Sequence, residues 1–157
     1  MKYSLCFPGQ GSQSVGMGRE LYDSFKSARE IFAEADDSLS FHLTRLMFDG
    51  SESELTLTRN AQPAIMTVSL AALSALKNEL GANINPVCAA GHSLGEYTAL
   101  TAAGVLKFAD SVRLVRDRGA FMQEAVPEGV GSMAALLGAK AEDVKNLCES
   151  IAPDGEI

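Results

Sequence analysis

One serine of this chain lies in the kind of turn that an exposed nucleophile needs. The turn follows a short apolar run over 86–90, which predicts a buried parallel strand, and it precedes a helix predicted over 96–103. Its residues are Gly91-His92-Ser93-Leu94-Gly95. G-x-S-x-G between a strand and a helix is typical of a nucleophile elbow, where the serine occupies a sharp, strained turn. A plain Gly-Ser turn is the alternative, because the pattern also arises by chance.

The same turn predicts a binding place for a negatively charged oxygen. The start of a helix presents free N–H groups and the positive end of the helix dipole, so the N–H of Leu94 is well placed to stabilise an oxyanion. We expect a second donor, Gln10, in the glycine-rich loop over 9–13 that follows a strand predicted over 3–7. A structural turn is the alternative for this loop. It is no phosphate cradle, because it lacks a P-loop lysine and has Ser14 where a dinucleotide fingerprint needs glycine.

Apolar periodicity extends this pattern along the chain. Short apolar runs alternate with segments whose apolar residues recur every three or four positions, which predicts an α/β fold with a parallel sheet and flanking helices. The longest helix begins at Asn60 with Pro63 in its first turn, is apolar on nearly every side and ends at Gly81. Further elements are predicted as helices over 19–39, 43–48, 108–124 and 141–151 and as a strand over 132–137.

Three arginines lie on the helix predicted over 108–124. Arg113 is far from the apolar stripe of that helix, so we expect it in solvent. Arg116 and Arg118 flank the stripe on opposite sides, and either could reach a pocket. Periodicity does not choose between these two, and a solvated helix face explains at least two of the three arginines.

Composition excludes several classes of function. The 13 basic and 20 acidic side chains give a net charge of −7, and aromatic residues make up 6%, which argues against nucleic-acid binding. A hydrophobic fraction of 46% suffices for a folded core, and no apolar run approaches the ~20 residues that cross a membrane. The 3 cysteines are widely spaced and form no C-x-x-C pair, so we expect reduced thiols in a cytoplasmic protein and no metal site.

Four motifs then follow one another along the chain. They are Phe7-Pro8-Gly9-Gln10-Gly11-Ser12-Gln13, Asn60-Ala61-Gln62-Pro63-Ala64, the segment 91–97 and the segment 112–123. In this order they resemble the amino-terminal half of the malonyl-CoA:acyl-carrier-protein transacylases of type II fatty-acid synthesis. The resemblance extends over essentially all 157 residues. Acyltransferase domains of polyketide and fatty-acid megasynthases share the motifs, but a start at Met1 favours the stand-alone enzyme.

The resemblance implies acyl transfer in two steps and gives each candidate residue a role. Ser93 matches the nucleophile that accepts malonyl as an ester, and Gln10 and Leu94 match the oxyanion donors. Arg118 matches the arginine that pairs with the free carboxylate of malonate. Three further residues are expected around the substrate: Gln62, Met122 and His92. Malonyl-CoA is a substrate, so no cofactor is implied, and the partner is acyl carrier protein.

A serine nucleophile needs a base, and the resemblance implies a histidine from the carboxyl-terminal half of the family. The chain has only His42 and His92. Neighbouring side chains in an extended segment point apart, so we expect His92 to be a buried, hydrogen-bonded structural residue rather than the base for Ser93. We expect His42 on the surface. The chain is therefore expected to be inactive alone.

The resemblance also implies two domains. Residues 1–127 match the first part of an α/β-hydrolase-like large domain, and residues 128–157 match the first strand and helix of a small ferredoxin-like subdomain. Since the later elements are missing, we expect a fragment that associates with itself or with a complementary carboxyl-terminal chain. A serine hydrolase is a competing function, but no histidine follows Ser93 to complete its triad. A non-catalytic interaction module is the other alternative.

Overall fold

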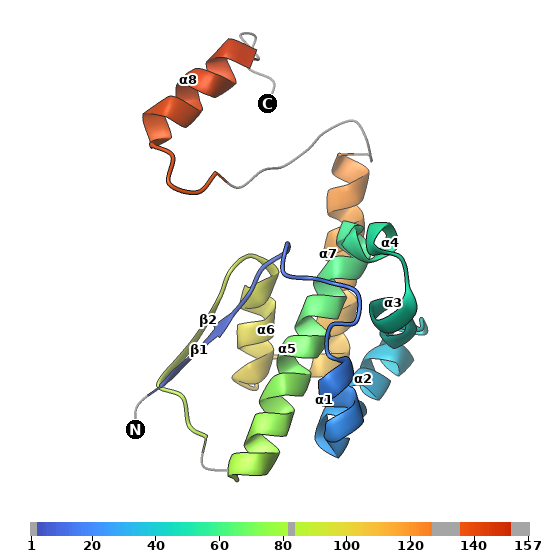
Figure 1. Ribbon diagram of the computed structural model, residues 1–157. Coiled ribbons are helices and arrows are strands. Elements are labelled where there is room, and N and C mark those ends of the chain that lie inside the picture. Colours follow the sequence, from blue (N-terminus) through green and yellow to red (C-terminus); the bar gives the residue numbers. More distant parts are fainter. Residues whose placement is uncertain (1–2, 82–83, 127–135, 152–157) are drawn as a thin grey trace. The chain divides into compact units, whose positions relative to one another are not determined.

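The structure, a computed structural model, describes residues 3–81, 84–126 and 136–151. They belong to two units, residues 1–127 and 128–157, each with its own internal contacts (Figure 1). Among the helices of the described ranges, none has both the length and the apolar character of a membrane-spanning segment.

Two parallel strands carry the loops of the candidate site at their carboxyl ends. β1 (Ser4–Phe7) pairs in parallel with β2 (Cys88–Gly91), and Phe7 lies opposite Gly91. These strands and the helices beside them confirm the predicted α/β fold. The prediction that the second strand is buried is wrong, because Cys88 and Ala90 are exposed on a face that no described element covers.

The helix predicted over 19–39 is two helices. α1 (Arg19–Ser24) ends at Phe25, whose extended backbone (φ −123°, ψ 120°) also precedes α2 (Lys26–Leu39). The side chain of Arg29 stabilises the break by donating from Nη1 to two carbonyls of the last turn of α1, at 3.1 and 3.0 Å. The apolar periodicity runs through the break and therefore could not reveal it.

Two short helices connect α2 to the centre of the unit. α3 (Leu43–Asp49) confirms the helix predicted over 43–48. α4 (Glu52–Thr56) was not predicted, since its few residues form no periodic stripe. Its N-cap is Ser51, whose Oγ accepts the N–H of Glu54 at 3.2 Å.

The longest helix, α5 (Thr58–Leu80), lies at the centre of the first unit. It begins before Asn60, so Pro63 lies in its second turn and not in its first as predicted. Most residues over 60–75 are buried, as expected, but the last turn over 76–80 is exposed, including Leu76 at 44%, and Gly81 ends the helix.

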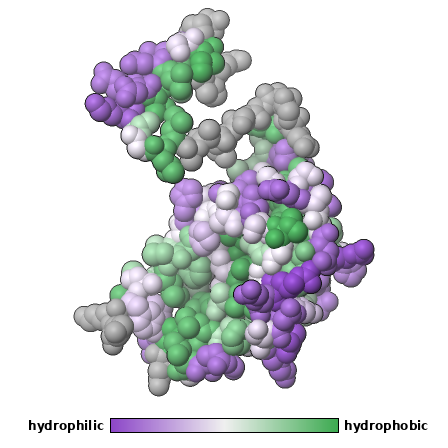
Figure 2. Space-filling view, viewed as in Figure 1, coloured by the Kyte–Doolittle hydropathy of each residue, from purple (hydrophilic) through white to green (hydrophobic). Residues whose placement is uncertain are grey.

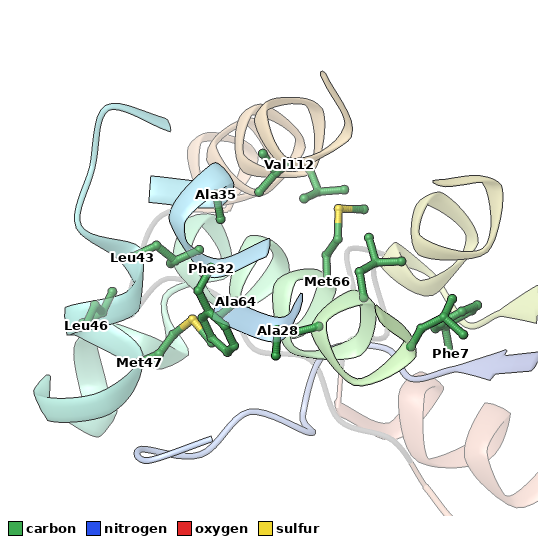
Figure 3. Close-up of a cluster of buried hydrophobic side chains, with 14 of the residues drawn as sticks. Phe7, Ala28, Phe32, Ala35, Leu43, Leu46, Met47, Ala64, Met66 and Val112 are labelled. Carbon is green, nitrogen blue, oxygen red and sulfur yellow. The ribbon is translucent and has the colours of Figure 1, made fainter. Parts of the chain in front are cut away.

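α5 packs against α7 and α2, while α6 lies beside the sheet (Figure 1). α6 (Leu94–Ala102) starts directly after Ser93, and α7 (Phe108–Ala125) confirms the helix predicted over 108–124. Figure 3 shows the core between these helices, to which Phe32 of α2, Met66 of α5 and Val112 of α7 contribute side chains. All three are 0% exposed, and burying a side chain of this size contributes about 1.5–3 kcal/mol.

The second unit contributes one described helix, α8 (Ala141–Ile151), which confirms the predicted helix over 141–151. Its first turn carries Glu142 and Asp143, whose charges suit the positive end of the helix dipole. The strand predicted over 132–137 falls mostly outside the described residues. The assignment of 128–157 to a ferredoxin-like subdomain stays a prediction.

Candidate active site

Ser93 occupies a backbone conformation that non-glycine residues rarely adopt. Its φ is 55° and its ψ is −113°, and strain of this kind costs about 1–3 kcal/mol. The residue joins the end of β2 to the first residue of α6, and it is exposed. The structure thus confirms the predicted sharp turn between a strand and a helix, with an exposed serine in it.

Glycines on both sides of Ser93 allow close backbone contacts. A Cβ on Gly91 would overlap the carbonyl of Gly95. A Cβ on Gly95 would lie 2.6 Å from the carbonyl oxygen of Phe7, at the end of β1. The turn therefore packs against itself and against the neighbouring strand, and these contacts hold the strained serine.

The glycine-rich loop after β1 lies against the serine turn. A Cβ on Gly9 would meet both the ring and the carbonyl of His92, and the N–H of His92 donates to the carbonyl of Phe7 at 3.1 Å. The side chain of Gln10 donates from Nε2 to Oγ1 of Thr58 at 3.2 Å, which connects the loop to the start of α5. Sequence analysis missed Thr58, which no motif marks.

Two backbone N–H groups at this junction are free for an oxyanion. Leu94 opens α6, where the positive end of the helix dipole lies. Gln10 lies in the loop that packs on the serine turn. Within the described ranges, no group accepts the N–H of Leu94 or of Gln10. Their role as oxyanion donors stays a prediction, which the absence of another acceptor within the described ranges favours.

Arg118 is the arginine that reaches the serine. It donates from Nη2 to Oγ of Ser93 at 3.1 Å and from Nη1 to Oε1 of Gln62 at 2.7 Å. Its guanidinium carbon lies 5.8 Å from the ring centroid of Tyr97. Tyr97 ends the predicted serine motif but had not been singled out. A planar guanidinium beside a nucleophile is suited to bind a carboxylate through two parallel hydrogen bonds.

Gln62 and Met122 both lie next to Arg118, at different depths. Met122 is half-buried and lines, with Arg118 and Phe121, a hollow of about 420 Å³. Gln62 is fully buried and donates from Nε2 to Sδ of Met122 at 3.3 Å. The expectation that Gln62 contacts substrate therefore needs correction, because its side chain exposes no surface and touches the site through Arg118.

Gly119 brings Arg118 within reach of Gln62. A Cβ on Gly119 would lie 2.5 Å from the carbonyl oxygen of Thr58 and 2.7 Å from the Cα of Arg59. Only glycine allows α7 and α5 to approach so closely at this point. The glycine after the arginine thus sets the distance between the two side chains.

The other arginines of α7 lie elsewhere. Arg116 stacks over the ring of Phe41, 4.2 Å from its centroid. Burial in the first place, and then the neighbouring Arg59, lower the pKa of Arg116, while Asp117 raises it. Arg113 is exposed, as expected, and donates to a backbone carbonyl of α2. The structure therefore settles the choice that periodicity left open.

Neither histidine of the chain pairs with the serine. His92 is exposed, and within the described residues its ring has no hydrogen-bond partner, so the expectation of a buried, hydrogen-bonded residue is wrong. The reason is that its ring lies over the loop at Gly9 rather than inside the sheet. His42 is exposed, as expected. No group of three or more candidate ligands among the described residues could hold a metal ion.

Comparisons with known proteins match almost the whole chain. The acyl transferase domain family matches residues 5–153. A malonyl CoA-acyl carrier protein transacylase from Bacillus subtilis (strain 168) is 51% identical over 156 residues, which cover 99% of this chain and 48% of that protein. The chain thus spans about half the length of the curated relatives it matches.

Solved structures extend the comparison. The acyl-carrier-protein-S-malonyltransferase from Bartonella henselae superposes with a TM-score of 0.88 at 49% identity, over 99% of this chain and 50% of that chain. A complex of a type II PKS acyl-carrier protein with its malonyl-transacylase contains a chain with a TM-score of 0.88 at 43% identity. That match covers 100% of this chain and 50% of the other.

Proposed function

The chain belongs to the acyl transferase domain family, and from this premise we propose that Ser93 transfers malonyl from malonyl-CoA to the phosphopantetheine thiol of an acyl carrier protein, in fatty-acid biosynthesis. One observation carries the proposal: a strained, exposed serine has an arginine Nη2 3.1 Å from its Oγ. The name of the Bacillus subtilis relative and the carrier-protein complex support the choice of substrate and partner.

The chemistry consists of two acyl exchanges. In the first, Oγ of Ser93 attacks the thioester carbonyl of malonyl-CoA, the C–S bond breaks, and the departing CoA sulfur takes up the proton that Oγ loses. In the second, the pantetheine thiol attacks the serine ester, the C–Oγ bond breaks, and Oγ regains a proton. In both steps the carbonyl oxygen gains negative charge, which the N–H groups of Leu94 and Gln10 would stabilise.

Arg118 is the residue that selects the acyl group. A malonyl ester on Ser93 ends in a carboxylate, and the guanidinium beside Oγ offers it paired N–H donors. An acetyl group offers no such partner and leaves the half-buried guanidinium without one. Malonyl is therefore preferred over acetyl.

Proton transfer limits this chain. The chain contains two histidines, and neither is hydrogen-bonded to Ser93. Arg118 donates to Oγ and accepts no proton at neutral pH. We therefore infer that the serine is loaded slowly by this chain alone, and that a base supplied by a further polypeptide segment raises the rate.

We also propose association with a further chain and a cytoplasmic location. The exposed face of the sheet and the exposed side chain of Val87 suit contact with a second copy or with a complementary carboxyl-terminal chain. The three cysteines are unpaired, which fits the reducing conditions of the cytoplasm.

The test is acylation of the intact chain. The protein is incubated with malonyl-CoA and weighed by mass spectrometry, with Ser93→Ala as the matched control. We expect a malonyl adduct that forms slowly and on the original chain only, with little transfer to the thiol of added holo acyl carrier protein, because this chain has no histidine paired with Ser93. Release of malonate to water instead would indicate a hydrolase. Absence of any adduct after long incubation would contradict the proposal and favour a non-catalytic module.

A further inference from the structure

We propose that Gln62 is a neutral positioning residue, which fixes the guanidinium of Arg118 beside Ser93 without cancelling its charge. The inference rests on the proposed function, in which Arg118 binds the malonyl carboxylate. Gln62 is 0% exposed, so it acts through Arg118 and not on the substrate. The resemblance gave this residue only a place in the pocket wall.

The hydrogen bonds of Gln62 define a single orientation of its amide. Oε1 accepts from Nη1 of Arg118 at 2.7 Å, and Nε2 donates to Sδ of Met122 at 3.3 Å. A flipped amide would turn its NH₂ group toward the guanidinium, where two donors would face each other. Arg118 and Met122 therefore fix the orientation of the amide, and the amide in turn holds Nη1 of Arg118 in place.

The hydrogen bond to Gln62 leaves Nη2 of Arg118 directed at Ser93. With Nη1 bound to Gln62, Nη2 lies 3.1 Å from Oγ of Ser93. A free arginine side chain loses rotamer entropy when it binds a ligand, and a guanidinium already held in place loses less. Holding Nη1 thus favours binding of a carboxylate that is attached to Ser93.

For carboxylate binding by Arg118, the neutral charge of the Gln62 amide matters as much as its position. Among the described residues, no carboxylate lies within ion-pair distance of Arg118. A buried carboxylate in the place of the Gln62 amide would form an ion pair with the guanidinium and compete with the substrate for it. The amide accepts one hydrogen bond and leaves the positive charge to the substrate.

Two variants separate position from charge. Gln62→Met has a similar length and removes the acceptor, whereas Gln62→Glu keeps the acceptor and adds a negative charge. Thr67→Val is the matched control, because Thr67 is also 0% exposed on α5 and donates only to the carbonyl of Pro63, at 2.8 Å. Each chain is studied by NMR of the Arg118 guanidinium N–H groups and by calorimetric binding of malonyl-CoA and acetyl-CoA.

In Gln62→Met we expect the Arg118 N–H signals to broaden and the preference for malonyl-CoA to fall about tenfold, the weight of one charge-assisted hydrogen bond. In Gln62→Glu the signals should stay sharp while the preference falls at least as far. Thr67→Val should change neither. Sharp signals in Gln62→Met would overturn the positioning role, and an unchanged preference in Gln62→Glu would overturn the argument from neutrality. If the original chain shows no preference, the proposed function fails, and the NMR signals still decide whether Gln62 positions Arg118.

Discussion

At the scale of single residues, the strain at Ser93 must be balanced by contacts around it. The positive φ of 55° costs about 1–3 kcal/mol. The compensation comes from Gly91 and Gly95, which bring β1, β2 and α6 into backbone contact. The serine turn is therefore sensitive to a single methyl group at either glycine.

We expect Gly95→Ala to destabilise the protein although it adds a good helix former to α6. Alanine normally stabilises a helix interior by about 1 kcal/mol relative to glycine, but here its Cβ would lie 2.6 Å from the carbonyl oxygen of Phe7. The free energy of unfolding should fall by about 2 kcal/mol, as measured by urea denaturation. Gly104→Ala is the control, because nothing lies within 4 Å of its Cβ and only its φ of 76° opposes the change. A more stable Gly95→Ala protein would disprove the contact.

Arg118→Lys should separate charge from geometry. Lysine keeps the positive charge and loses the planar pair of donors, so we expect malonyl-CoA to lose about tenfold in its preference over acetyl-CoA as acyl donor to Ser93. Competition between the two donors, followed by mass spectrometry, measures the ratio. Arg113→Lys, on the exposed face of α7, should leave it unchanged. Equal preference in the Arg118→Lys protein and the original would show that charge alone selects the acyl group.

The sequence predicts which chemical groups form this site better than it predicts which residues they contact. The exposed position of Ser93 was predictable, because a G-x-S-x-G motif between a strand and a helix is typical of a strained turn with an exposed serine. Periodicity could not choose Arg118 over Arg116, since both flank the same stripe, and only the family resemblance selected Arg118. In the structure, Arg118 reaches Gln62 whereas Arg116 stacks on Phe41. The exposure of His92 was misjudged, because the loop that it covers is distant in sequence.

At the scale of elements, local patterns predicted the type of most described helices and strands, but they missed α4 and did not predict how far neighbours cover each element. β2 was expected to be buried because its residues are apolar, yet burial depends on which elements pack on each face. Likewise, Arg29 stabilises the break at Phe25, because its guanidinium donates to carbonyls at the end of the preceding helix. Such interactions between elements leave no periodic signal in the chain.

The contact between α5 and α7 makes a prediction at this scale. Gly119→Ala would place a Cβ 2.5 Å from the carbonyl oxygen of Thr58, so the two helices must move apart. We expect a loss of about 2 kcal/mol in the free energy of unfolding and a weaker contact between Arg118 and Gln62, visible in the guanidinium N–H signals. Ala120→Gly, one residue further, should cost about 1 kcal/mol from helix propensity alone and leave those signals unchanged. Unaltered signals in Gly119→Ala would show that helix spacing does not set the site.

At the scale of the whole molecule, the first unit has a well-buried helical core and an incompletely covered sheet. Within the described residues the sheet has two strands, so each strand has an unpaired edge. An isolated pair of strands is marginally stable in water unless something packs on it. Here helices cover one face only, and Figure 2 shows hydrophobic side chains gathered over β1, β2 and α6. This region is therefore the part of the unit most inclined to bind another chain.

We expect the chain to associate as its concentration rises, because unpaired strand edges and exposed apolar side chains favour contact with a further copy. Sedimentation velocity over a range of concentrations measures this. Val87, beside β2, is 63% exposed, and Val87→Lys should reduce association by placing a charge at the sheet edge while leaving the circular dichroism spectrum unchanged. Glu34→Lys, on the exposed side of α2, adds positive charge away from the sheet and should not reduce association. A monomer at every concentration, or equal association in the original chain and Val87→Lys, would show that the open sheet is not the contact surface.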